Sequence, residues 1–143
     1  MQTVNSDAAT PPIEEIAPIL NIKTPTILNY FEAFDACDYE ATSQQFALDG
    51  TLHPPFESPI VGRDAIEHYL NAEAKGITSQ PQQEMIGQAL EDGCTEIQVT
   101  GRVKTPLFGV GVSWLFTLND QQEIVLLKLK LIASPQELLK LRK

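Results

Sequence analysis

The hydrophobic period of this chain changes along its length, and that change constrains the fold more than any other feature. In the last third, apolar residues recur at every second position in three segments, 95–101, 110–118 and 124–132. In the last of these, leucines alternate with Lys128 and Lys130. A period of two is typical of strands that bury one face and expose the other. The sequence therefore predicts an antiparallel sheet with one buried face.

The first half of the chain shows helical spacing instead. Thr24-Pro25 places a hydroxyl cap before a proline at the first helical position, which predicts a helix start. The apolar stripe that follows spans about a 100° arc, and its members are Ile27, Tyr30, Phe31 and Phe34. This helix should turn an aromatic face to the interior. Cys37 falls at the margin of that face and is expected in the core.

A second, shorter helix is predicted within 38–50, where an aspartate supplies the cap and Asp-Gly the end, and it includes Phe46 and Leu48. Three prolines in 51–61 indicate an edge strand or an ordered loop. A third helix should begin within 62–64. Three helices followed by an antiparallel sheet predict an α+β fold, in which a curved sheet wraps the helices and leaves a cone. Such a cone holds side chains or a ligand.

Two terminal segments complete the predicted organisation. Residues 1–23 contain three prolines and only a short apolar stretch, which indicates a mobile leader before a domain of residues 24–143. Near the other end, Ser134-Pro135 and Glu137 form a capping box that predicts a short terminal helix.

Charge and composition exclude several classes of function. The 143 residues include 19 acidic and 10 basic side chains, and the net charge of −9 disfavours binding to nucleic acid. The longest apolar run, 124–133, contains two lysines and is too short to span a membrane. No secretion signal is evident, so we expect a cytoplasmic location with Cys37 and Cys94 as free thiols. With His53 and His68, these cysteines form no metal-ligand spacing.

Two aromatic side chains with polar groups are the strongest candidates for a ligand site. Tyr30 projects from the aromatic face of the first helix, and Trp114 from the apolar parity of segment 110–118, so both should point into the cone. A phenolic hydroxyl and an indole N–H can each donate a hydrogen bond, and together they could hold one carbonyl oxygen. In the alternative interpretation, both are ordinary core residues that donate to backbone carbonyls.

Two further candidates have less support from the sequence. His53 precedes two prolines and could act as an acid or base, but no Asp or Glu stands at an obvious spacing, and a solvated loop histidine is the alternative. Cys94 has the parity of Glu96 and Gln98, so it should face away from the cone. It is a candidate for oxidation or an intermolecular disulfide, or else an inert thiol. The sequence contains no nucleophile elbow, phosphate loop or nucleotide fingerprint.

A set of short motifs follows in order, nearly ungapped, from Thr24 onward. They are ILNY at 27–30, PPF at 54–56, PIVG at 59–62, EDG at 91–93, VTG at 99–101, TP at 105–106, FG at 108–109, Trp114, and ASPQELL at 133–139. In this combination the chain resembles the C-terminal domain of cyanobacterial orange carotenoid proteins. The helical domain that precedes it in those proteins has no counterpart here, so the chain is similar to stand-alone homologs of the C-terminal domain.

The resemblance implies a nuclear transport factor 2-like cone. It also implies that Tyr30 and Trp114 donate hydrogen bonds to the 4-keto oxygen of a ketocarotenoid such as canthaxanthin or echinenone. By parity and helix face, we expect the apolar walls for the ring and polyene to include Phe34, Val61, Leu127, Leu129 and Leu131. Burial of several such side chains should contribute more affinity than the two hydrogen bonds, which would fix orientation and colour.

Two departures from the family pattern and one match to it put the contacts with the helical domain in doubt. Leu107 replaces a tryptophan, Cys94 replaces a phenylalanine, and Glu73 matches a glutamate that pairs with an arginine of that domain. A carotenoid is longer than one cone, so half of it would protrude from a monomer. We therefore expect a homodimer that shares one carotenoid.

The function expected from the resemblance is that of a carotenoid carrier that performs no bond chemistry. It would take pigment from membranes by transient contact, donate it to helical carotenoid proteins, and quench singlet oxygen. One alternative is an isomerase or dehydratase of the same fold, with His53 or a carboxylate as the base. Another is an interaction module whose cone is filled by its own side chains.

Overall fold

The computed structural model describes residues 22–85 and 87–132. Its helices are α2 (Pro25–Asp35), α3 (Tyr39–Gln44) and α4 (Arg63–Glu73). Its strands are β1 (Phe46–His53), β2 (Ile60–Val61), β3 (Thr78–Glu84), β4 (Gln88–Ala89), β5 (Thr95–Lys104), β6 (Gly109–Leu118) and β7 (Ile124–Ile132). No helix among the described residues is both long enough and apolar enough to cross a bilayer.

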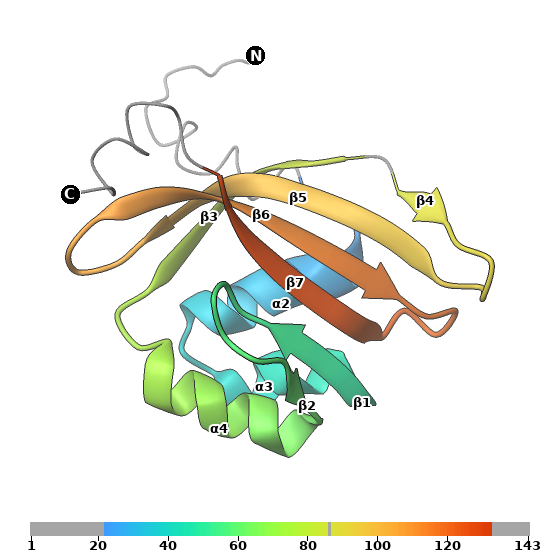
Figure 1. The fold of residues 1–143 in the computed structure, drawn as a ribbon, viewed down its shortest axis with the longest axis horizontal. Helices are drawn as coiled ribbons and strands as arrows, with labels where there is room; N and C mark the ends of the chain where they lie inside the picture. Colours follow the sequence, from blue (N-terminus) through green and yellow to red (C-terminus); the bar gives the residue numbers. More distant parts are fainter. Residues whose placement is uncertain (1–21, 86, 133–143) are drawn as a thin grey trace, which may run out of the picture.

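The strands form one curved sheet in the order β2-β1-β7-β6-β5-β3, with β4 paired to β5. All three helices lie on the concave side of this sheet (Figure 1). The predicted α+β architecture is therefore confirmed. Neighbouring strands are antiparallel, as predicted, except that β1 pairs parallel with β7.

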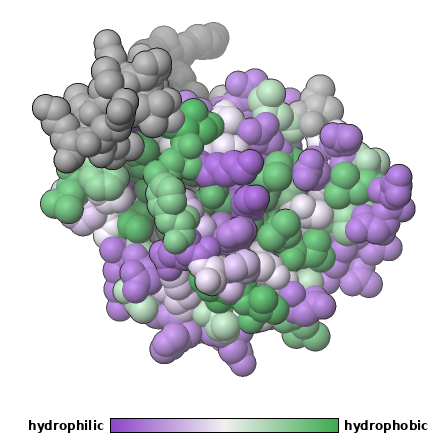
Figure 2. Space-filling model, in the orientation of Figure 1, coloured by the Kyte–Doolittle hydropathy of each residue, from purple (hydrophilic) through white to green (hydrophobic). Residues whose placement is uncertain are grey.

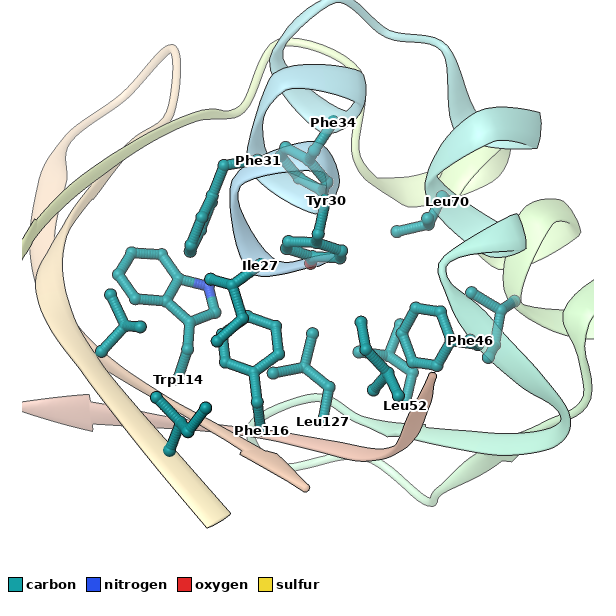
Figure 3. Close-up of a cluster of buried hydrophobic side chains, with 14 of the residues drawn as sticks. Ile27, Tyr30, Phe31, Phe34, Phe46, Leu52, Leu70, Trp114, Phe116 and Leu127 are labelled. Atoms are coloured by element: carbon teal, nitrogen blue, oxygen red, sulfur yellow. The ribbon is translucent and has the colours of Figure 1, made fainter. Parts of the chain in front are cut away.

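The core lies between the aromatic face of α2 and the inward face of β6. Phe31 meets Trp114 edge-on with ring centroids 4.9 Å apart, and Tyr30 meets Phe116 in the same way at 5.6 Å. Figure 3 shows these rings interleaved above the strands. Edge-to-face contacts of this kind add about 0.5–1.5 kcal/mol each beyond the area that they bury. The stripe predicted from spacing is thus the face that fixes α2 to the sheet.

The start of α2 is capped by a residue distant in sequence. Thr24 makes no side-chain cap, contrary to the prediction, although the proline follows it as expected. Instead Glu84 of β3 accepts hydrogen bonds from the backbone N–H groups of Lys23 and Thr24, both at 3.1 Å, and from the Thr24 hydroxyl at 2.8 Å. A carboxylate here is favourable because the N–H groups and dipole of a helix start are positive. The contact joins α2 to β3.

The prediction that Phe46 and Leu48 belong to the second helix is wrong. Helix α3 ends at Gln44, and both residues lie in β1. Leu48 is 77% exposed, whereas Phe46 is fully buried. The backbone N–H of Ile124 donates to the carbonyl of Gln45. Pairing with β7 therefore determines the conformation, which local spacing could not reveal.

The remaining predictions for this half of the chain have mixed outcomes. The third helix begins at Arg63, within the predicted range, and 54–59 forms the loop before the two-residue edge strand β2. Cys37 is exposed, contrary to the prediction, because the chain turns there with φ of 60°. The leader and the terminal helix fall outside the described residues, apart from Ile22 and Lys23, and the division at residue 23 stays a prediction.

Candidate functional site

An apolar pocket of about 320 Å³ opens between the helices and the concave side of the sheet. This volume is near the lower end of the range of small-molecule sites, about 300–1,000 Å³. Its walls come from α2, α4, the 54–56 loop and strands β1, β3, β5, β6 and β7. The lining residues include Tyr30, Phe34, Leu52, Tyr69, Leu70, Ser79, Val103, Phe108, Val110, Val112, Trp114, Leu129 and Leu131. The predicted cone therefore contains an open space rather than a complete filling of side chains.

Tyr30 and Trp114 both line this pocket, as the sequence predicted for an inward direction. Their side chains are 3% and 1% exposed. Each carries a group that can donate a hydrogen bond, whereas the buried side-chain polar atom without a hydrogen-bond partner among the described residues is the hydroxyl of Tyr39. Figure 3 shows the nitrogen edge of the indole turned to the side on which Tyr30 lies.

The protonation state of Tyr30 follows from its surroundings. Burial raises the pKa of the Tyr30 hydroxyl well above its ordinary value of 10.0, and the negative charge of Asp35 raises it further. Tyr30 is consequently a neutral hydrogen-bond donor at any physiological pH. A neutral hydroxyl at the pocket wall can donate a hydrogen bond to an acceptor that enters the pocket.

The mouth of the pocket is surrounded by exposed apolar side chains. Phe56 and Phe108 line the pocket and are 93% and 58% exposed, and Leu107 beside them is exposed as well. The Thr105 hydroxyl accepts hydrogen bonds from the backbone N–H groups of Leu107 and Phe108, which fixes this turn. Figure 2 shows green, apolar side chains at the left of the view, where Figure 1 places the β5–β6 turn.

The predicted apolar walls divide into three groups. Phe34, Leu129 and Leu131 line the pocket. Leu127 points inward but is fully buried in the core and does not reach the space. The structure places Val61 outside, 60% exposed beside α4, because strand parity turns the preceding Ile60 toward the core instead.

Sequence reasoning missed several lining residues. Val110 and Val112 share the parity of Trp114 on β6, so alternation alone could have found them. Tyr69 and Leu70 lie on the inward side of α4, which helical spacing also indicated. Phe56, by contrast, comes from a loop, and no periodic signal could have placed it at the mouth.

Three acidic side chains lie at the pocket wall or contact residues that line it. Glu73 lines it, at the last turn of α4. Tyr69 donates a hydrogen bond to Glu57 at 3.1 Å, and burial together with Glu57 and Glu73 raises the pKa of Tyr69 to about 12. Asp35 accepts a hydrogen bond from the backbone N–H of the lining residue Ser79 at 2.9 Å.

The other chemically reactive candidates, His53, His68 and Cys94, do not line this pocket. His53 sits with Lys128 and Lys130 at a surface site that adjoins the pocket and shares lining residues with it, among them Phe56 and Leu131. Partial burial and Asp92 raise the pKa of the Cys94 thiol, which does not favour a reactive thiolate. His68 is exposed, as predicted. The described residues contain no cluster of three His, Cys, Asp or Glu side chains that could hold a metal ion.

Comparison with known proteins identifies the family to which this domain belongs. The chain matches the nuclear transport factor 2 (NTF2) domain over residues 24–127. It belongs to the NTF2 domain family. This NTF2 domain is 37% identical over 125 residues to an orange carotenoid-binding protein of Synechocystis sp., and 35% identical over 127 residues to that of Limnospira maxima. The resemblance recognised from short motifs is thereby confirmed.

These similarities concern only a part of each relative. The alignments cover 85% and 86% of this chain but 39% and 40% of the two relatives. A solved structure of an orange carotenoid protein from an Anabaena (Nostoc) species, described as binding canthaxanthin, has a TM-score of 0.75 and 38% identity. That match covers 84% of this chain and 39% of the other. The NTF2 domain described here thus spans about two-fifths of the length of these proteins.

Proposed function

We propose that this NTF2 domain binds a ketocarotenoid, such as canthaxanthin or echinenone, by one end, and carries it without performing bond chemistry. The observation that carries the proposal is the pocket itself. It is apolar, it is open, and it is lined by two side chains that can donate hydrogen bonds, Tyr30 and Trp114. The similarity to orange carotenoid-binding proteins supports a ligand of this class.

In the proposed complex, Tyr30 and Trp114 donate to the keto oxygen of the terminal ring. Each bond would contribute about 0.5–1.5 kcal/mol, since both donors lose water when the pocket fills. Phe34, Leu129 and Leu131 would contact the ring and the start of the polyene. Their burial would supply most of the affinity, at about 25 cal/mol for each Å² of apolar surface removed from water.

The size of the pocket supports a shared or transferable ligand. About 320 Å³ holds one end of a carotenoid and leaves the rest outside. A second copy of this chain would cover the other end in a homodimer. The exposed apolar mouth around Phe56 and Phe108 would contact that copy, a membrane during uptake, or a helical carotenoid protein that receives the pigment. A cytoplasmic carrier of this kind would also quench singlet oxygen.

The two alternatives from other classes have less support. An isomerase or dehydratase needs an acid and a base in the pocket, but Glu73 is the lone Asp, Glu, His or Lys among the described lining residues, and His53 lines only the adjoining surface site. A pure interaction module with a filled cone is disfavoured by the open space. The curated relatives are named for binding rather than catalysis.

Expression in cells that make canthaxanthin tests the proposal. We expect a coloured protein whose absorption is red-shifted relative to the free pigment. Tyr30→Phe combined with Trp114→Phe should shift this absorption toward the blue. Tyr69→Phe is the matched control, because Tyr69 also lines the pocket but already donates to Glu57. A colourless protein, or a double variant with an unchanged spectrum, would contradict the proposal.

A further inference from the structure

The apolar pocket borders a second space at its mouth, which we call the adjoining site. This site has a volume of about 290 Å³. It shares five lining residues with the pocket: Pro54, Pro55, Phe56, Leu129 and Leu131. A ligand that protrudes from the pocket therefore meets the adjoining site at these shared residues.

The adjoining site lies where β1 ends and β7 continues. His53, the last residue of β1, is paired with Lys128, and the pairing of the two strands goes no further. The chain then leaves the sheet at Pro54. Among the described residues, the rest of β7 has a strand neighbour, β6, on one side only. The adjoining site occupies the space that this step in the sheet leaves beside β7.

The other three residues that line the adjoining site carry basic side chains: His53, Lys128 and Lys130. None of them forms an ion pair with a described residue, and no acidic side chain is among the described residues that line the site. On β6, the register partners of the two lysines are uncharged, namely Leu115 and Ser113. Although the chain as a whole carries a net charge of −9, this site can attract an anion.

The acidic side chains near the mouth are directed toward α4. Glu73 belongs to α4 and lines the pocket, but it does not line the adjoining site. Glu57 follows Phe56 in the sequence, but its carboxylate accepts a hydrogen bond from the Tyr69 hydroxyl on α4, and it lines neither space. Among the described lining residues of the two spaces, basic side chains occur only in the adjoining site.

An apolar space beside a basic site matches a ligand that has one apolar chain and one anionic end. Burial of the chain in the pocket would supply most of the affinity, because affinity from this source grows with the apolar area removed from water. The anionic end would stay at the surface and keep much of its hydration, so it avoids the cost of burying a charge. Exposed ion pairs contribute little each, so the lysines would set a preference for the anion rather than the bulk of the affinity.

We propose that the pocket and the adjoining site together bind a long-chain fatty acid, with the acyl chain in the pocket and the carboxylate at Lys128, Lys130 and His53. This ligand class goes beyond the pigment of the proposed function, because its polar end is charged and stays at the mouth. The acyl chain and the pigment ring occupy the same pocket, so the two ligands compete.

cis-Parinaric acid and its methyl ester provide a matched pair of probes, because they share one polyunsaturated chain and differ in the charge of the end. Trp114 is the sole tryptophan of the chain and lines the pocket, so energy transfer from Trp114 to the probe reports occupancy. At neutral pH and low salt, we expect both probes to bind and the acid to bind about fivefold more tightly than the ester. At about 1 M salt, where the Debye length falls to about 3 Å, this ratio should approach one.

Substitutions of lysines at different places separate local charge from net charge. Lys130→Gln should lower the acid-to-ester ratio about twofold, and Lys128→Gln combined with it should bring the ratio close to one. The affinity for the ester should not change, which also shows that the variants fold. Lys23→Gln is the matched control for a single substitution, because Lys23 is exposed and lines neither space. The ratio should stay as in the wild type.

Each contrary result overturns a stated part of the proposal. Equal binding of acid and ester by the wild type, or an acid preference that persists in the double lysine variant, would overturn the role of the basic side chains. A ratio that falls in Tyr30→Phe but not in the lysine variants would place the carboxylate inside the pocket instead. If neither probe binds but the protein sediments with phosphatidylglycerol vesicles, the basic side chains face a membrane and the fatty-acid site is wrong.

The inference and the proposed function fail separately. If neither probe binds and the protein is coloured in cells that make canthaxanthin, the proposed function stands and the fatty-acid site is overturned. If the acid binds with the expected preference and the protein stays colourless in those cells, the fatty-acid site stands and the proposed function is overturned. If both ligands bind, added fatty acid should release the pigment, and failure to do so would overturn the shared pocket.

Discussion

The ring of Phe31 packs between Tyr30 and Trp114 and contacts each of them edge-on. The ring centroids lie 5.2 Å from Tyr30 at an angle of 77° and 4.9 Å from Trp114 at 86°. Phe31 is fully buried and does not line the pocket. The separation of the two donor residues is therefore fixed by a side chain that a ligand in the pocket would not contact.

Phe31→Leu should disturb the donor geometry while it keeps both donors. The substitution loses two edge-to-face contacts and leaves a small cavity, so we expect the free energy of unfolding to fall by about 2 kcal/mol. Denaturant unfolding measures this, and the absorption of bound canthaxanthin should shift as well. Ile66→Val is the control, since Ile66 is buried in the core without lining the pocket. It should lower stability and leave the spectrum unchanged; a spectral shift of the same size in both variants would contradict the role of Phe31.

Gly50 is a position where a side chain cannot be accommodated. A Cβ atom there would lie 2.6 Å from the carbonyl oxygen of Ile124, which is backbone and cannot move away cheaply. Gly50→Ala should therefore destabilise the fold by about 1–3 kcal/mol through displacement of β1 from β7. At Gly109 the nearest atom to a Cβ would be 3.4 Å away, on Arg102, so Gly109→Ala should be tolerated. Similar melting temperatures for the two variants would argue against this packing.

Tyr30 should make the protein sensitive to alkali. Its pKa in the folded state is raised above the ordinary value of 10.0, so the folded protein keeps a proton that the unfolded chain releases. This contribution to stability is complete below pH 10.0 and decreases as the pH rises beyond it. Above the ordinary pKa of tyrosine, the free energy of unfolding should fall with pH less steeply in Tyr30→Phe than in the wild type. The two slopes should differ by up to about 1.4 kcal/mol per pH unit. Equal slopes for wild type and variant above pH 10.0 would show that the hydroxyl is not buried as described.

The sequence predicted the fold wherever one face of an element is buried along its whole length. The alternation of β7 and the aromatic stripe of α2 are examples, and both positioned their residues correctly. The prediction failed at Phe46, where a short segment has no clear period and the long-range pairing with β7 decides between helix and strand. A parallel neighbour that lies more than seventy residues later cannot be inferred from local spacing.

The candidate site shows the same division. Tyr30 and Trp114 could be placed in the pocket because each lies on a regular element with a defined inward face. Val61 was predicted to lie on the inward face, but it lies on the outward face. Strand β2 has only two residues, so it has no period from which the inward residue could be read. The capping of α2 by Glu84 and the hydrogen bonds that Glu57 and Asp35 accept arise from contacts between distant segments. Such contacts have no signature in a single sequence.

Phe56 combines an unfavourable backbone conformation with an exposed aromatic ring at the mouth. Its φ is 64°, in the left-handed region, which costs a residue other than glycine about 1–2 kcal/mol. Its side chain is 93% exposed, so packing in the described structure does not offset this cost. We expect contact with the protruding part of a bound polyene to do so.

Phe56→Asn should therefore separate folding from ligand retention. Asparagine tolerates the left-handed conformation, so the free energy of unfolding of the ligand-free protein should stay equal or rise by up to about 1 kcal/mol. The dissociation rate of bound canthaxanthin should increase severalfold, since an apolar contact at the mouth is lost. Leu48→Asn is the matched control, because Leu48 is also exposed but lies on β1 away from the pocket. Unchanged pigment release from Phe56→Asn would mean that the ring does not cover the ligand, and the exposed aromatic would then have to serve a surface other than the carotenoid.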